Sequence, residues 1–364
     1  MKIFRNGAAL FLSTTMMTGT AFAQSALDNV VVPSGSQQSY AASVFAERKD
    51  GSFVRNIDDG GAQGGNASNT RVYGGRLAQQ GVWPAMVGLH DMTQMTEDPE
   101  TFPYTFFCGG TLVARQWVLT AAHCVIDREG NLLDASTLRI RSGHVDMLQG
   151  DLREIAALIP HPDYGGPNLS NDIALIKLAQ PVTDSSGPVG AIAVQQPGQT
   201  LPEGTAVVTG WGQTEDGSYP LDLLETDIDI LPNDLCNDGY REQNRRDLAD
   251  MIQIVGNATD MPFEKMEEAY LILANNLGDQ VSSSMICAGV SSGERGSCYG
   301  DSGGPLLQQD ANGKWIQVGV VSWGGTELQT RFINPGWCGQ EELYGIYTRV
   351  SDYFDWIGQT IQAN

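Results

Sequence analysis

Three short segments of the chain carry side chains that could act together in nucleophilic catalysis. They are residues 119–124 with His123, residues 171–175 with Asp172, and residues 300–305 with Ser302. A serine hydroxyl is a poor nucleophile at neutral pH unless a neighbouring base takes its proton as it attacks a carbonyl. His123 would be that base, and Asp172 would hold its imidazole in the productive tautomer. Each segment alone also fits a structural role, but explaining all three that way needs three separate coincidences.

The elements that must position these side chains are predicted to be short strands. From residue 72 onward, apolar runs are bounded by glycine, proline, asparagine or aspartate, a texture typical of an all-β barrel or sandwich. The 43 glycines among 364 residues agree with a fold rich in turns. The expected strands lie within residues 85–89, 117–121, 173–178, 206–208 and 315–322.

Two regions depart from this strand pattern. Apolar residues recur at helical spacing before and after Pro262, which predicts a helical hairpin inserted at about residues 237–281. Residues 353–361 place apolar side chains on one face and predict a terminal helix packed on the strands. The periodic residues are Leu248, Met251, Ile252, Val255, Met266, Tyr270, Leu273 and Leu277 in the hairpin, and Phe354, Ile357 and Ile361 in the terminal helix.

Composition and the N-terminal segment limit the partners and the compartment. The chain has 21 Lys and Arg against 43 Asp and Glu, a net charge of −22, so nucleic acid and anionic membranes are not expected as partners. Lys2 and Arg5 precede an apolar run that ends in small residues, so residues 1–23 are predicted to be a signal peptide. No later stretch approaches the roughly 18 apolar residues of a membrane span. We therefore expect a secreted or periplasmic protein whose six cysteines form disulfides.

Residues 24–71 differ from the rest of the chain. They are rich in serine, glycine, asparagine and glutamine and have no sustained apolar period. Such a segment cannot bury enough surface to offset its ordering entropy. We predict a flexible leader over residues 24–71, followed by a folded domain over residues 72–364.

The three motifs, in the order His, Asp, Ser, resemble those of the chymotrypsin/trypsin-like serine proteases, and the resemblance extends from Val72 to the C-terminus. It implies an all-β fold of two packed antiparallel six-stranded β-barrels with a C-terminal helix. It further implies a monomeric serine endopeptidase that cleaves protein or peptide substrates through an acyl-enzyme on Ser302, without a cofactor. The N–H groups of Gly300 and Ser302 would form the oxyanion hole. A calcium site is not expected, because the short loop 143–150 has His144 where a carboxylate would be needed.

The same resemblance implies activation by proteolysis. Arg71 precedes Val72-Tyr73-Gly74-Gly75, which is similar to the mature N-terminus of the family. An activating protease that cut after Arg71 would free an α-ammonium on Val72, which would pair with Asp301 and order the oxyanion loop. The leader would then be the activation peptide of a zymogen. The alternative is that Arg71 is a basic residue with no role in activation that happens to precede a Gly-Gly turn.

The resemblance also pairs the six cysteines. The implied disulfides are Cys108–Cys124, Cys236–Cys287 and Cys298–Cys338. Bridges of this kind typically contribute about 2 to 4 kcal/mol each.

The resemblance places the base of the substrate pocket at Gly296 and its walls at Gly324 and Gly345. Trypsin-like members have an aspartate at the base, and without it a basic side chain would be desolvated with no ionic partner. We therefore expect cleavage after aromatic or large aliphatic residues. A carboxylate near in sequence would restore a Lys/Arg preference if it reached the pocket, the candidates being Glu294, Glu341 and Glu342. The other expected substrate-binding residues are Ser297, Tyr299, Ser322 and Trp323.

Some alternatives stay open at this level. The chain could be a non-catalytic protease-like binding module, or an esterase that uses the same nucleophile. The helical insertion either forms an exosite or gate for protein substrates or is an elaborated loop packed on its own apolar face. His90, His144 and His161 lie outside the motifs and are expected to be structural.

Overall fold

The computed structural model describes residues 74–96, 98–165, 169–183, 189–201, 205–325, 338, 340 and 342–364. Several predictions concern residues outside these ranges. They are the signal peptide 1–23, the leader 24–71, the junction of Arg71 and Val72, and Glu341.

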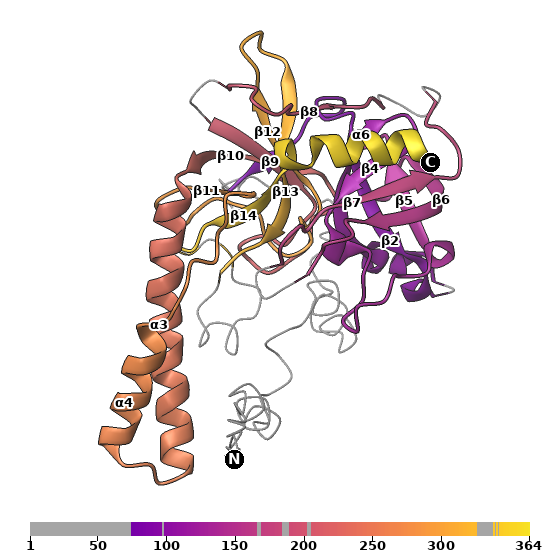
Figure 1. The fold of residues 1–364 in the computed structure, drawn as a ribbon. Coiled ribbons are helices and arrows are strands. Elements are labelled where there is room, and N and C mark those ends of the chain that lie inside the picture. Colours follow the sequence, from indigo (N-terminus) through magenta and orange to yellow (C-terminus); the bar gives the residue numbers. More distant parts are fainter. Residues whose placement is uncertain are drawn as a thin grey trace, which may run out of the picture. The chain divides into compact units, whose positions relative to one another are not determined.

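Six strands in the N-terminal half form a closed antiparallel barrel (Figure 1). Its strand order is β2-β3-β4-β7-β6-β5. In β5 buried and half-buried residues alternate, as expected for a strand with one face on a core. The strands are β2 (Met86–Asp91), β3 (Phe106–Ala114), β4 (Trp117–Thr120), β5 (Leu138–Ser142), β6 (Asp151–Pro160) and β7 (Ala174–Leu178).

A second set of six strands closes in the order β9-β10-β11-β14-β13-β12, because β12 and β10 both pair with β9. Two short strands join its margins, β1 (Arg76–Leu77) on β10 and β8 (Ala193–Val194) on β13. This confirms the two six-stranded β-barrels, and each of the five expected runs contains a strand. The strands are β9 (Thr205–Gly210), β10 (Leu224–Leu231), β11 (Met285–Gly289), β12 (Pro305–Gln309), β13 (Trp315–Trp323) and β14 (Gly345–Arg349).

The inserted hairpin is present as α3 (Asn233–Ala258) and α4 (Phe263–Ala274), which lie side by side and extend away from β10 and β11 (Figure 1). The first helix begins at Asn233, earlier than expected, directly after Pro232, whose lack of an N–H is tolerated at a helix start. The periodicity identified the helices but only part of their inner faces. Of the periodic residues, Met251, Val255 and Leu273 are exposed, whereas five are half-buried, namely Leu248, Ile252, Met266, Tyr270 and Leu277. Gly256 of α3 is buried against Met266 of α4.

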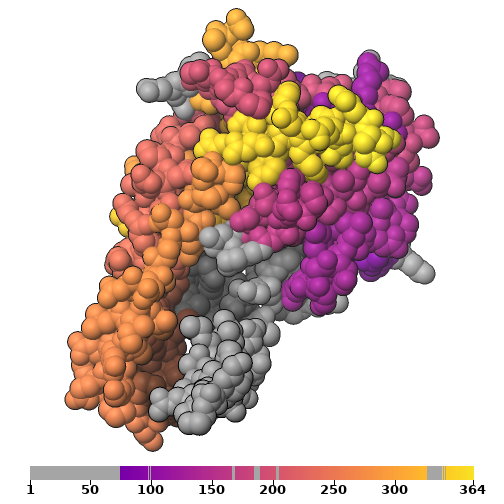
Figure 2. All heavy atoms as spheres, viewed as in Figure 1, coloured from indigo at the N-terminus to yellow at the C-terminus, as the bar shows by residue number. Residues whose placement is uncertain are grey.

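The C-terminal helix α6 (Phe354–Ala363) follows a 3₁₀ turn at Val350–Tyr353. Tyr353 and Ile357 are buried in the core of the first barrel, although the preceding strand belongs to the second. In Figure 2 the yellow atoms of α6 lie against the magenta atoms of the first barrel. The helix therefore ties the two barrels together.

None of the helices in the described ranges combines the length and apolar character needed to cross a membrane. The other short 3₁₀ helices are Met92–Gln94, Pro99–Thr105, Ala122–Cys124 and Ala135–Thr137.

Candidate active site

His123 and Asp172 form a buried imidazole–carboxylate pair. His123 lies in the turn after β4, and Asp172 lies two residues before β7, which pairs with β4. The ring Nδ1 is 2.7 Å from Asp172 Oδ2, and the backbone N–H of His123 donates to Oδ1 at 2.9 Å. Because an ionised carboxylate only accepts hydrogen bonds, this contact places the proton on Nδ1 and leaves Nε2 with its lone pair. Such an imidazole can accept a proton at Nε2.

The second barrel also holds Asp172. Ser322 Oγ, near the end of β13, donates to Asp172 Oδ2 at 2.5 Å, and Thr348 Oγ1 in β14 donates to the backbone carbonyl of Asp172 at 2.7 Å. Ser322 was expected only in the substrate pocket, and neither contact was expected from the sequence. The only available signal was a small hydroxyl residue in a mostly apolar strand.

The loop of Ser302 is tied to strands on both sides. Gly109 N–H in β3 donates to the carbonyl of Ser302 at 2.8 Å, and Thr120 Oγ1, three residues before His123, donates to the carbonyl of Gly109 at 2.8 Å. Gly303 N–H donates to the carbonyl of Val321 at 2.9 Å, next to Ser322. These contacts bring the serine loop to the segments that carry the histidine and the aspartate.

Two backbone donors are available beside Ser302. Gly300 has a φ of +96°, in the left-handed region that favours glycine, and a Cβ there would lie 3.2 Å from Gly212 Cα. Within the described residues, the N–H groups of Gly300 and Ser302 donate to no acceptor. The hydroxyl of Ser302 makes no hydrogen bond to the ring of His123 in this structure. In serine hydrolases without substrate this hydrogen bond is often long or misaligned, and it tightens when substrate binds.

Asp301 is buried, and the partners of its carboxylate in the described part of the chain are backbone N–H groups. Gly212 donates to Oδ1 and Cys298 to Oδ2, each at 2.8 Å. A side chain at Gly212 would collide with this carboxylate. Burial raises the pKa of Asp301 to about 6, although the two N–H groups lower it. No ion pair to Asp301 occurs among the residues that the structure describes.

The structure contains the three disulfides that were expected, Cys108–Cys124, Cys236–Cys287 and Cys298–Cys338. In the described chain one group of side chains has ligand atoms close enough for a metal ion, namely Cys108, Cys124 and His123. Both sulfurs belong to one disulfide, so neither is available as a thiolate ligand. This group is therefore not a metal site.

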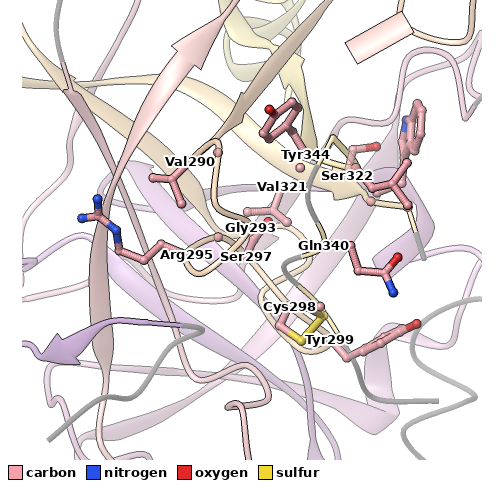
Figure 3. A pocket seen from close by; sticks show the side chains of 18 of the residues that line it. Val290, Gly293, Arg295, Ser297, Cys298, Tyr299, Val321, Ser322, Gln340 and Tyr344 are labelled. Atoms are coloured by element: carbon pink, nitrogen blue, oxygen red, sulfur yellow. A yellow bond between two sulfur atoms is a disulfide. The ribbon is translucent and has the colours of Figure 1, made fainter. Parts of the chain in front are cut away.

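A pocket opens beside Ser302 (Figure 3). A Cβ at Gly296 or at Gly324 would meet no atom within 4 Å, so both positions leave the pocket open. Ser297 Oγ lies 3.1 Å from Tyr347 Oη, which gives this region a neutral polar pair. The expected residues Ser297, Tyr299, Ser322, Trp323 and Gly345 all line the pocket. Several lining residues were not expected from the sequence, among them Val290, Val321, Gln340, Leu343 and Tyr344.

The pocket walls carry little charge. Among the described lining residues Arg295 alone has a charged side chain, and its guanidinium extends away from the pocket (Figure 3). Glu294 and Glu342 do not line the pocket, and both are exposed. These two carboxylates therefore do not supply the negative charge in the pocket that a preference for lysine or arginine would need.

The inserted hairpin begins against the pocket wall. The ring of Tyr240 in α3 packs on Trp323 with centroids 5.1 Å apart, and its hydroxyl donates to the carbonyl of Tyr344 at 2.5 Å. Both Trp323 and Tyr344 line the pocket. The first turns of α3 are therefore part of the support of this site.

The other histidines have structural contacts. His90 Nδ1 lies 2.8 Å from Thr105 Oγ1, and His144 Nδ1 accepts a hydrogen bond from the N–H of Asp146 at 3.0 Å. The ring of His161 packs between two aromatic residues of the C-terminal segment, and burial lowers its pKa.

Comparison with known proteins gives the family. The trypsin family model matches residues 72–261 and 264–357. Transmembrane protease serine 11G of Mus musculus is 30% identical over 293 residues, 79% of this chain and 54% of that protein. Its Rattus norvegicus counterpart is 32% identical over 251 residues, 69% of this chain and 48% of that protein. The clotting factor G beta subunit of Tachypleus tridentatus is 30% identical over 293 residues, 79% of each chain.

The chain spans about half the length of the two transmembrane proteases. The family match, by contrast, covers nearly all of the described residues and includes both barrels. The chain belongs to the trypsin family.

Proposed function

We propose that the protein is a serine endopeptidase. The observation that carries the proposal is the buried His123–Asp172 pair, which Ser322 fixes from the strand that also binds the loop of Ser302. Ser302 Oγ attacks the scissile carbonyl while His123 Nε2 takes its proton, and the imidazolium formed is stabilised by Asp172. His123 then protonates the leaving amine. Water, deprotonated by the same base, releases the acyl group from Ser302.

The N–H groups of Gly300 and Ser302 would stabilise the tetrahedral oxyanion. Donors already oriented in a water-poor site cost little reorganisation when charge develops on the carbonyl oxygen. Removal of one such donor typically lowers the rate by about 100- to 1000-fold. The absence of any other acceptor for these two groups within the described chain supports this role.

We infer that the protein is made as a secreted or periplasmic zymogen. Residues 1–23 would be the signal peptide and residues 24–71 the activation peptide, removed when another protease cuts after Arg71. The family match begins at Val72, the proposed new N-terminus. Gly74 N–H donates to Glu215, three residues after Gly212, so the chain that follows Val72 already lies at the loop that holds Asp301. An ammonium on Val72 would give that buried carboxylate its missing cation.

The proposed specificity is for aromatic or large aliphatic residues before the scissile bond. The open glycine positions and the neutral Ser297–Tyr347 pair support an uncharged side chain. Cleavage of a mixed peptide library measures this preference directly. Cuts mainly after lysine or arginine would contradict it and would favour a trypsin-like pocket.

The activity is tested by labelling the nucleophile. The full chain is treated with a trypsin-like activator, Val72 is verified as the new N-terminus, and a serine-directed phosphonylating probe is added. We expect label on Ser302 after cleavage and none in the Ser302→Ala variant. Failure to label correctly cleaved, folded protein would favour a non-catalytic binding module. Labelling with hydrolysis of esters but not of peptides would favour an esterase.

A further inference from the structure

One face of α3 changes from buried to exposed along the helix. At its start Cys236 and Tyr240 are buried against the second barrel, and Gln243, one turn further on, is also buried. At further steps of three and four residues the same face passes through Met251 and Ile254, which are 45% and 66% exposed. The change occurs where α3 extends beyond the strands (Figure 1).

Three large apolar side chains make up this exposed part of the face. Val255, 47% exposed, lies beside Met251 and Ile254 at helical spacing, and we call the three residues the hairpin patch. The patch does not serve the contact between the two helices, since Gly256 is the buried residue of α3 that faces Met266 of α4. The patch is therefore available to a partner.

The surroundings of the patch are acidic. Residues 245–268 contain six acidic side chains and three basic ones, Arg245, Arg246 and Lys265. Both arginines are paired with Glu242. Lys265 is itself paired with Glu268 at 2.6 Å. A partner of this surface needs apolar side chains for the patch and positive charge for the acids around it. A second copy of this chain, with a net charge of −22, would be repelled, as would an anionic lipid surface.

The patch lies on the same face of α3 as Tyr240, the residue that packs on the pocket wall. At a rise of about 1.5 Å per residue, Met251 is about 16 Å along the helix from Tyr240. An extended polypeptide covers that distance in about five residues. A chain bound in the pocket could thus reach the patch without a long loop.

We propose that the hairpin patch is an exosite that holds a basic, apolar segment of a protein substrate while the scissile bond lies at Ser302. This rests on the proposed endopeptidase activity. The apolar side chains supply contact area, and the acids steer and orient the cationic segment.

Binding is measured with the Ser302→Ala form of the full chain, so that catalysis plays no part. The probe is a synthetic, fluorescently labelled 18-residue peptide with lysine on one helical face and leucine on the other. We expect salt-sensitive binding that weakens about tenfold in the double variant Met251→Ser, Ile254→Ser. The matched control is Leu132→Ser, which removes an apolar side chain that is 52% exposed on the first barrel. If the peptide bound the double variant as tightly as it bound the Leu132→Ser control, the proposal would be overturned.

Kinetics on the activated enzyme separates the exosite from the active site. With the same two substitutions, KM should rise about tenfold for a protein substrate carrying the basic, apolar segment and stay unchanged for a tetrapeptide. Equal changes in KM for both substrates would overturn the exosite proposal. It would also be overturned if the patch mediated concentration-dependent dimerisation, or if the protein bound phosphatidylcholine vesicles and the two substitutions abolished that binding. If the unsubstituted enzyme does not cleave the tetrapeptide, the proposed activity fails, while the binding experiment still reports on the patch. Thermal unfolding checks that each variant is folded.

Discussion

Asp172 and Asp301 are both buried near Ser302, yet their surroundings differ. The carboxylate of Asp172 accepts hydrogen bonds from the ring and backbone of His123 and from Ser322. The carboxylate of Asp301 accepts two backbone N–H groups among the described residues, and burial raises its pKa to about 6. One aspartate has a partner that can become a cation during the reaction, whereas the other has none among the described residues.

This difference divides the proposed mechanism into two parts. The base and its orienting carboxylate are assembled within the uncut chain, because their contacts come from folded strands. Around Asp301 the described residues supply no positive charge, and cleavage after Arg71 would supply one. Under this proposal activation completes the oxyanion loop and leaves the His123–Asp172 pair as it is.

The largest expected effect is that of Asp172→Asn. The amide would favour the wrong tautomer of His123 and could not stabilise the imidazolium, so kcat should fall by about 10⁴-fold. The measurement is kcat for a tetrapeptide with enzyme cleaved at Arg71. KM should change little, and a loss below tenfold would remove Asp172 from the proposed role.

The Asp301→Asn change should lower the activity of the cleaved form. Without a carboxylate to hold the ammonium of Val72, the oxyanion loop would lose its order, and kcat should fall by about 100- to 1000-fold. The assay compares cleaved wild type and variant after N-terminal sequencing of both. Equal activity in the two would mean that Asp301 plays no part in activation.

The same aspartate predicts a pH dependence in the uncut protein. A raised pKa means that the folded state binds more protons than the unfolded state between pH 3.8 and about 6. The free energy of unfolding should therefore fall by about 3 kcal/mol as the pH rises through this window, at about 1.4 kcal/mol per pKa unit.

Denaturant unfolding at pH 4 and pH 6 gives the fall in the free energy of unfolding for the wild type and for the Asp301→Asn variant. The contribution of Asp301 is the fall in the wild type minus the fall in the variant. In enzyme cut at Arg71 the ammonium would favour the carboxylate, and the contribution should disappear. An equal fall in the free energy of unfolding in the two proteins would show that folding does not raise the pKa of Asp301.

Much of the two barrels and their motifs could be predicted because the signals are local. Apolar runs bounded by turn residues located five strands, and His123 and Asp172 each lie in a recognisable short segment next to one of them. Ser302 lies in an equally recognisable segment that precedes β12. The hairpin shows the limit of such signals. Helical periodicity identified α3, but Met251 and Val255 face solvent, because periodicity does not reveal where the neighbouring structure ends.

The contacts that orient the site were harder to predict. Ser322 and Asp172 are 150 positions apart, and their hydrogen bond depends on how the two barrels meet. Tyr240 lies in the insertion yet supports the pocket wall, and its contacts with Trp323 and Tyr344 depend on how α3 packs on the second barrel. No short segment contains that information.

The smallest effect concerns the contact that links the two barrels at Asp172. Ser322→Ala removes one O–H donor from a carboxylate that keeps both donors from His123, and a hydrogen bond to a charged group contributes about 1.5 kcal/mol or more. We expect kcat to fall by about tenfold. Thr348→Val is the matched control, because Thr348 binds the backbone carbonyl of Asp172 and leaves the carboxylate untouched. If both variants lost activity equally, the two hydrogen bonds would serve only to position the loop of Asp172. The hydrogen bond from Ser322 to the carboxylate would then have no separate effect on catalysis.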